Sequence, residues 1–116
     1  MKIKEIKRIV VKIGSSLIVD KDKGVDAKFL NNIGEDILSL RKKGIDTLIV
    51  SSGAIELGKI ELKKTKEKLN LSENQAASSI GQIKLINAWK EALKTFGLDS
   101  AQILITAEDT ENRKRF

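Results

Sequence analysis

Two short runs of aliphatic and β-branched residues, separated by a segment with helical periodicity, constrain the fold most. The first run is Arg8–Ile13 (RIVVKI) and the second covers residues 47–51 (TLIVS). Short continuous apolar runs are typical of strands that are buried on both faces. A strand, a helix and a second strand in this order favour a right-handed crossover and parallel strand pairing.

The segment between the two runs has the start and stop signals of a helix. Asp26 stands where an N-cap residue belongs, and Gly44 stands where a C′ glycine belongs. Residues 19–24 (VDKDKG), which precede Asp26, are polar and predict a turn. The apolar residues recur at helical spacing on one face: Leu30, Ile33, Ile37 and Leu40.

A longer helix is predicted from Ser72 to the region of Gly97. Ser72 and Gln75 match a capping box, in which each side chain satisfies a backbone donor near the other. The residues expected to form its apolar stripe are Ala76, Ile80, Ile83, Trp89 and Phe96. We expect a third strand over residues 101–106 (AQILIT). The predicted class is therefore α/β, with a mainly parallel sheet and helices on both faces.

A glycine inside the predicted long helix needs an explanation. Gly81 costs about 1 kcal/mol relative to alanine in a helix interior. The residue therefore indicates a close approach by another helix, a partner subunit or a ligand. Its neighbour Gln82 is equally compatible with a site and with a solvated surface.

Composition excludes several kinds of site. The net charge is +6, but the lysines are spread along the whole chain and aromatic residues make up only 3%. Base stacking therefore lacks its usual side chains, and we expect a solvated lysine-rich surface and no nucleic-acid partner. Without cysteine or histidine, no disulfide, no zinc site built on those residues and no histidine-activated nucleophile is available, and no metal site is predicted. No apolar run approaches the roughly 20 residues of a membrane span, so we expect a cytoplasmic protein without membrane contact.

The chemistry is expected in two small loops that follow the two predicted strands. Residues 12–16 (KIGSS) and 51–54 (SSGA) stand at carboxyl ends of strands, where α/β sheets bind ligands. Lys12 interrupts an apolar run, and its ammonium group is suited to stabilise a phosphoryl group during transfer. Two simpler interpretations stay open: Lys12 extends from an edge strand into solvent, and Ser52-Gly53 is an ordinary turn. Walker and GxGxxG patterns are absent.

Four motifs, taken together, carry a family resemblance. VVKIGSSLI, VSSGAIELG, QAASSIGQIKL and AQILIT followed by ENRKRF occur in this order. From residue 8 to 116 the chain resembles the N-terminal part of the glutamate 5-kinases, a branch of the amino acid kinase family. Several other branches have glycine pairs where this chain has Ser15-Ser16 or Ser52-Gly53, which favours this branch.

The resemblance implies a reaction and its substrates. Such an enzyme transfers the γ-phosphoryl group of ATP, with Mg²⁺, to the side-chain carboxylate of L-glutamate, and the L-glutamyl 5-phosphate enters proline biosynthesis. The catalytic residue would be Lys12, which also binds the ATP phosphates together with Gly14 and Ser15. Residues Ser52, Gly53 and Ala54 would bind glutamate.

The resemblance also predicts what the chain lacks. Residues 1–116 correspond to the acceptor-binding N-terminal part of the kinase domain, and the nucleotide-binding half is absent from them. We therefore expect the chain alone to be inactive and the full-length protein to be a homo-oligomer. The alternatives are another family member with a different acidic acceptor, and a non-catalytic α/β module that binds an amino acid or associates with itself.

Overall fold

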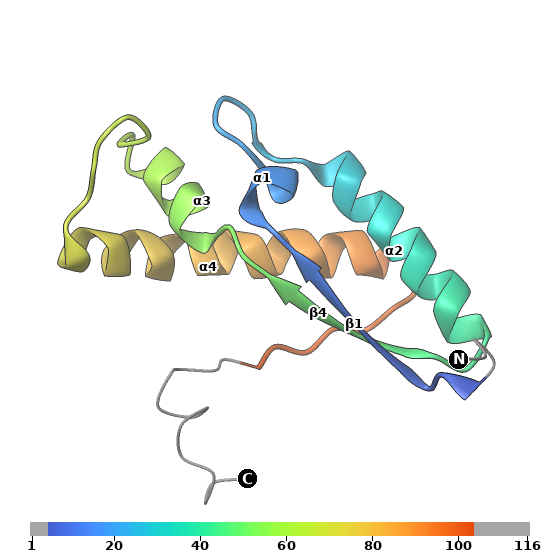
Figure 1. Ribbon diagram of the computed structural model, residues 1–116. Helices are drawn as coiled ribbons and strands as arrows, with labels where there is room; N and C mark the ends of the chain where they lie inside the picture. Colours follow the sequence, from blue (N-terminus) through green and yellow to red (C-terminus); the bar gives the residue numbers. More distant parts are fainter. Residues whose placement is uncertain (1–4, 104–116) are drawn as a thin grey trace, which may run out of the picture.

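The computed structural model describes residues 5–103, which form two parallel strands, a small hairpin and a set of helices (Figure 1). In chain order the elements are β1 (Arg8–Ile13), α1 (Ser15–Ile18), β2 (Val19–Asp20), β3 (Gly24–Val25), α2 (Ala27–Lys42), β4 (Asp46–Ser51), α3 (Ala54–Glu61) and α4 (Leu71–Lys94). None of the helices within residues 5–103 is long and apolar enough to cross a membrane.

The two long strands pair in parallel. β1 and β4 run in register from Arg8 opposite Asp46 to Ile13 opposite Ser51, and α2 forms the crossover between them. The first strand has the predicted bounds, whereas the second begins one residue earlier than predicted. The expected turn over residues 19–24 is the antiparallel hairpin of β2 and β3. The α/β class and the parallel pairing are confirmed.

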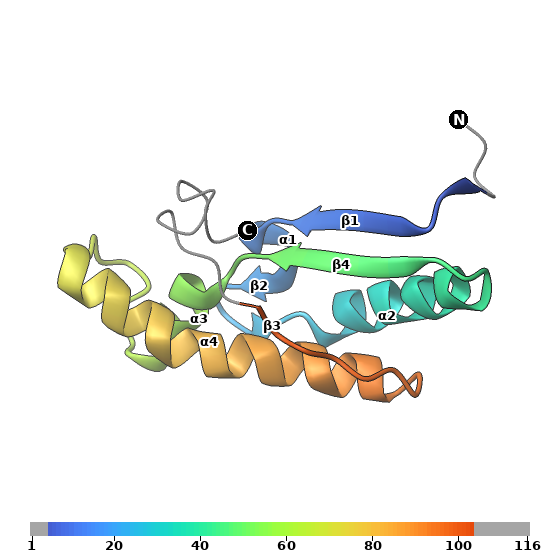
Figure 2. The same ribbon diagram turned by 90° about the horizontal axis from the view of Figure 1, so that it is seen from below.

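Within residues 5–103 the helices lie along one face of the β1–β4 pair, not along both as expected (Figure 2). Val11, Ile13 and Ile49 pack on that face against apolar residues of α2 and α4. On the opposite face Val10 and Leu48 are 64% and 54% exposed. Apolar residues on both faces are typical of parallel strands that are covered on both sides.

The helix α2 has the predicted ends. Asp26 is its N-cap, and the carboxylate accepts a hydrogen bond from the backbone N–H of Phe29 at 3.0 Å. Gly44 adopts a φ of +78° directly after the C-cap residue, a conformation that glycine takes without strain. Leu30 is fully buried and Ile33 packs against the same core, so the predicted face is the packed face.

The helix α4 begins earlier than predicted, because a different capping box forms. Asn70 is the N-cap, and its side chain accepts from the backbone N–H of Glu73 at 2.8 Å. The Glu73 carboxylate accepts from the backbone N–H of Asn70 at 3.2 Å and also pairs with Lys64 at 3.2 Å. The predicted box of Ser72 and Gln75 is therefore wrong. Asn and Ser are equally good N-caps, so the sequence pattern did not discriminate between the two starts.

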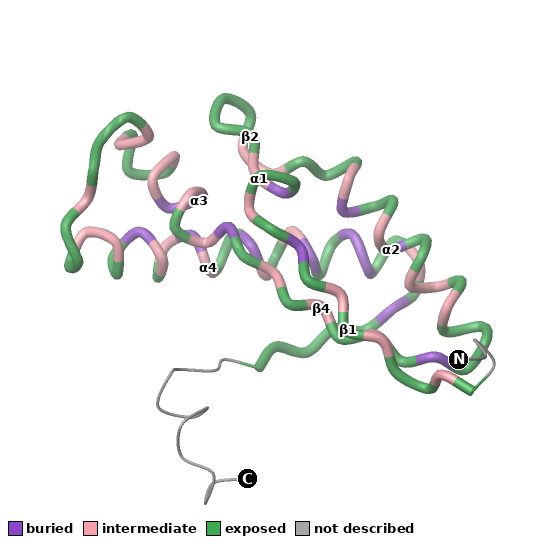
Figure 3. The backbone as a smooth tube through the Cα atoms, viewed as in Figure 1, coloured by how far each residue is buried: buried purple, intermediate pink, exposed green. Residues whose placement is uncertain are grey.

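The apolar stripe predicted for α4 is also wrong for most of its members. Of the predicted residues only Trp89 is buried, and Ile83 is 67% exposed. The buried residues are Ala77, Gly81, Leu85, Trp89, Ala92 and Leu93. In Figure 3 such buried positions recur at intervals along α4 and α2. Where α4 meets α3, the buried residues are the small Ala77 and Gly81, because α3 approaches there too closely for large side chains.

The close approach predicted at Gly81 is made by α3. A Cβ atom at Gly81 would lie 1.7 Å from the carbonyl oxygen of Ala54, and one at Gly58 would lie 1.8 Å from that of Ala77. Neither position has room for a methyl group, so the two helices meet backbone to backbone. This contact fixes where α3 begins.

The third strand predicted over residues 101–106 is not found in its described part. Residues 101–103 have no regular secondary structure, and 104–106 lie outside the described residues.

Replacing Gly81 by alanine tests the helix contact. Alanine raises helix propensity, but here we expect destabilisation of about 3 kcal/mol, at the upper end of the usual cost of overpacking. Thermal or urea unfolding of the longest polypeptide that the gene encodes measures the change. Ser79→Ala on the exposed face of α4 is the control, and an unchanged or raised stability of Gly81→Ala would contradict the contact.

The capping box at α4 predicts a pH dependence. Backbone hydrogen bonding to Asn70, and then Lys64, lower the pKa of Glu73 from its ordinary value of 4.5. Because the folded-state pKa is depressed, the stabilisation is present above pH 4.5 and is lost as the pH falls below it. The unfolding midpoint of the wild type should therefore exceed that of Glu73→Gln at pH 7. The difference between the two midpoints should shrink as the pH is lowered to 3. A difference that does not vary with pH would contradict this role.

Candidate functional site

The loops that follow β1 and β4 lie side by side. The backbone N–H of Ser52 donates to the carbonyl of Ile13 at 3.2 Å, and the Ser52 hydroxyl donates to the same oxygen at 3.5 Å. A Cβ atom at Gly53 would lie 3.9 Å from the Cβ atom of Ser15. The parallel pairing of β1 with β4 therefore brings together the two loops that were predicted to form the site.

The second loop has an unusual backbone. Gly53 adopts a φ of +125°, is buried, and is the N-cap of α3. No side chain caps this helix end. The first-turn N–H groups of a helix carry partial positive charge and suit a carboxylate or a phosphate. Ser52 is exposed directly beside them.

The backbone of the first loop, at Gly14, has more free space around it than that of the second loop, at Gly53. Gly14 has an ordinary extended backbone, and a Cβ atom there would have no neighbour within 4 Å. Ser15, one residue further, is half-buried at the start of α1. A ligand thus has space to approach the backbone of Gly14.

Lys12 projects from the face of β1 opposite the helices. It is exposed, lies opposite Val50 in register, and forms no ion pair within residues 5–103. Exposure removes the desolvation cost that a buried lysine would carry. Lys12 lies near the end of β1 beside the two loops, and its role in catalysis stays a prediction.

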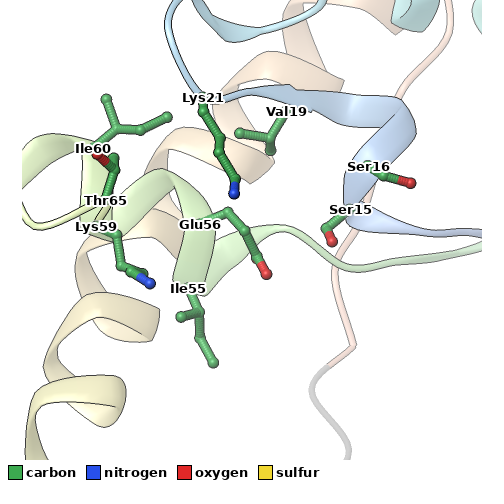
Figure 4. A pocket seen from close by; sticks show the side chains of 9 residues that line it. All are labelled: Ser15, Ser16, Val19, Lys21, Ile55, Glu56, Lys59, Ile60 and Thr65. Carbon is green, nitrogen blue, oxygen red and sulfur yellow. The ribbon is translucent and has the colours of Figure 1, made fainter. Parts of the chain in front are cut away.

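A hollow of about 370 Å³ lies beside these loops (Figure 4), a volume within the range of about 300–1,000 Å³ found for small-molecule sites. It is bounded by α1, the β2–β3 hairpin and α3. Its lining residues are Ser15, Ser16, Val19, Lys21, Ile55, Glu56, Lys59, Ile60 and Thr65. Figure 4 shows the Lys21 side chain entering the hollow from the hairpin and that of Glu56 entering it from α3. Both charge signs are thus available to a zwitterionic ligand.

The sequence does not predict the charged residues that line this hollow. Lys21 belongs to a segment that reads only as a polar turn, and Glu56 and Lys59 follow Gly53 within one ordinary helix. The available signal was their nearness in sequence to the two predicted loops. Only the packing of the hairpin against α3 brings them together.

An ionised carboxylate orders the hairpin that carries Lys21. The backbone N–H groups of Asp22 and Lys23 donate to the Asp20 carboxylate at 2.8 and 3.1 Å. These two hydrogen bonds lower the pKa of Asp20. The carboxylate therefore stays charged near neutral pH and holds the turn in which Lys21 lies.

The described residues offer anion-binding groups but no ready cage for a metal. Within residues 5–103 no three Asp, Glu, His or Cys side chains come together in a way that could hold a metal ion. Mg²⁺ that accompanies a nucleotide is usually held by phosphate oxygens with one or two carboxylates, so the loops fit the phosphates better than the ion itself.

Comparison with known proteins places the chain in a family. Residues 7–116 match the model of the amino acid kinase family, and the chain belongs to that family. It is 48% identical over 115 residues to a glutamate 5-kinase of Brucella abortus (strain S19). It is 48% identical over 113 residues to one of Bradyrhizobium diazoefficiens and 47% identical over 115 residues to one of Brucella ovis. These alignments cover 97–99% of the chain and 30% of each relative, so the chain spans about a third of their length.

The two loop glycines make a matched pair for testing the site's backbone. Gly53→Ala places a side chain at a positive φ, 3.2 Å from a methyl group of Val19, and should destabilise the protein by about 1–3 kcal/mol. Gly14→Ala meets nothing within 4 Å and should leave the unfolding temperature unchanged. Differential scanning fluorimetry measures both variants. Equal effects of the two substitutions would contradict the described loop conformations.

Proposed function

We propose that the complete polypeptide transfers the γ-phosphoryl group of ATP to the side-chain carboxylate of L-glutamate, forming L-glutamyl 5-phosphate for proline biosynthesis. The observation that supports this most is the contact between the Ser52–Gly53 turn and the Gly14–Ser15 turn. That contact provides two adjoining anion sites, which a phosphoryl transfer between two anionic substrates requires. The similarity to glutamate 5-kinases points to the acceptor.

The two loops divide the reaction between them. The first-turn N–H groups of α3, with Ser52, Gly53 and Ala54, hold the acceptor carboxylate of glutamate. Lys12, Gly14 and Ser15 bind the ATP phosphates. A carboxylate oxygen then attacks the γ-phosphorus, the bond from that phosphorus to the β,γ-bridging oxygen breaks, and ADP leaves. Lys12 stabilises the negative charge on the transferring group. Magnesium accompanying the nucleotide would add charge neutralisation at the phosphates that Lys12, Gly14 and Ser15 hold.

The hollow beside the loops accounts for the amino-acid part of the acceptor. Lys21 and Lys59 suit the α-carboxylate of glutamate, and Glu56 suits its α-ammonium group. Ile55, exposed beside them, lines the wall along which the methylene groups lie. An acceptor with an acetylated amino group would lose its pairing with Glu56, so this arrangement favours free glutamate.

The proposal extends to the cellular location and the partners of the enzyme. We infer a cytoplasmic enzyme that self-associates, with no nucleic-acid or membrane partner. The apolar outer face at Val10, Leu48 and Val50 is compatible with further packing.

Trapping the acyl phosphate with hydroxylamine tests the proposed reaction. The longest polypeptide that the gene encodes is incubated with ATP, Mg²⁺ and either glutamate, N-acetylglutamate or aspartate, with the 116-residue chain run in parallel. Hydroxamate is expected with glutamate alone, and we expect none from the 116-residue chain. Hydroxamate with only one of the other acceptors would establish a different acidic substrate. No product from a folded protein with any of the three would reject a kinase.

In the same assay Lys12→Met isolates the charge at the end of β1. We expect kcat to fall by about a hundredfold or more, as for other groups that stabilise transition-state charge. The unfolding temperature should not change, because Lys12 is exposed. The control is Lys90→Met, at another exposed lysine, which lies on α4. Unchanged kcat for Lys12→Met would show that Lys12 only extends into solvent.

A further inference from the structure

We propose that Trp89 is a positioning residue for the glutamate-binding loop and acts on it through Ser51, an inference that rests on the function proposed above. The indole N–H of Trp89 donates to the Ser51 hydroxyl at 3.0 Å. Ser51 is the last residue of β4 and directly precedes Ser52. The hydrogen bond therefore joins the C-terminal third of α4 to the point where the loop begins.

Burial restricts the orientation of the Trp89 indole ring, which carries the donor. Trp89 is 6% exposed and packs in the core with Ile13, Leu85 and Ala92. A buried indole N–H without an acceptor costs free energy, so the ring orientation and the acceptor position are coupled. Moving Ser51 away would leave this donor unsatisfied.

Ser51 connects the Trp89 hydrogen bond to the backbone of the loop. While its oxygen accepts from Trp89, its hydroxyl donates to the carbonyl of Ser52 at 3.4 Å. The N–H of Ser52, in the preceding peptide unit, donates to the carbonyl of Ile13. Hydrogen bonds therefore hold the backbone of Ser52 at both its N–H and its carbonyl group, directly before Gly53.

One face of α4 reaches the loop at three points, four residues apart. Gly81 meets the carbonyl oxygen of Ala54, and Leu85 lies 4.0 Å from the place of a Cβ atom at Gly53. Trp89 holds Ser51 in the third contact. The first two contacts are packing contacts, which limit how near the loop comes. The third is the directional one, so it selects the orientation of the loop's first peptide.

The expected consequence is a specific effect on glutamate binding. Trp89→Phe keeps an aromatic ring in the core but removes the donor, and Ser51→Ala removes the acceptor. Each should raise the KM for glutamate about fivefold, the loss expected for one neutral hydrogen bond, while the KM for ATP and kcat change less than about twofold. The double variant should be no worse than either single variant, because both remove the same interaction.

Two further variants separate positioning from general stability. Ser51→Thr retains the hydroxyl and should restore the KM for glutamate toward the wild-type value. Ser79→Ala removes a side-chain hydrogen bond within α4, to the carbonyl of Gln75 at 2.9 Å, without reaching the loop, and is the matched control for Ser51→Ala. Amide hydrogen exchange at residues 52–54, without substrates, should accelerate in Trp89→Phe and Ser51→Ala but not in Ser79→Ala.

The outcomes are decisive in each case. A KM for glutamate that is unchanged in both single variants of an active enzyme overturns the positioning role and leaves the proposed function standing. Additive effects in the double variant, or equal losses in kcat and both KM values, show a structural role only and also overturn it. If the wild type makes no glutamyl hydroxamate, the proposed function fails, and the role of Trp89 in glutamate binding fails with it.

Discussion

The backbone-to-backbone contact between α3 and α4 is the constraint on which the candidate site depends. Gly58 and Gly81 each stand where a methyl group would overlap a carbonyl group of the opposite helix. Two glycines in helix interiors cost about 1 kcal/mol each in propensity, and the contact that they permit offsets this cost. Because the carbonyl of Ala54 rests against Gly81, the start of α3 has one position relative to the sheet. The turn at Gly53 takes its place from that contact.

Local signals in the sequence predicted much of the frame. The β-branched run Arg8–Ile13 became β1 with the same bounds, and Asp26 and Gly44 mark the ends of α2 through side-chain and backbone preferences that act over a few residues. The glycine at 81 correctly predicted a close approach, and the structure identifies α3 as the neighbour. The placement of two loops at neighbouring strand ends followed from parallel pairing alone.

Tertiary packing decided what the sequence did not predict. As N-cap residues, Asn70 and Ser72 are locally equivalent. Asn70 is the N-cap in the structure, where its capping partner Glu73 also pairs with Lys64 from the preceding loop. The contact of Gly81 with α3 sets which face of α4 is buried, and Leu85 and Trp89 follow Gly81 on that face at intervals of four residues. Ile83 lies off this face and is exposed. The hollow combines side chains from the β2–β3 hairpin, from the helices α1 and α3 and from the loop after α3, and no local pattern links them.

In the proposed site, the loop of Ser52–Ala54 binds the acceptor and the loop of Gly14–Ser15 binds the phosphates. A crystal structure of the longest polypeptide that the gene encodes, with glutamate and a non-hydrolysable ATP analogue, tests it most directly. We expect the side-chain carboxylate of glutamate at the start of α3, with its amino-acid end toward Lys21 and Glu56. We expect the γ-phosphate between the two loops, near Lys12. Glutamate bound elsewhere, or a γ-phosphate remote from Gly14, would contradict it.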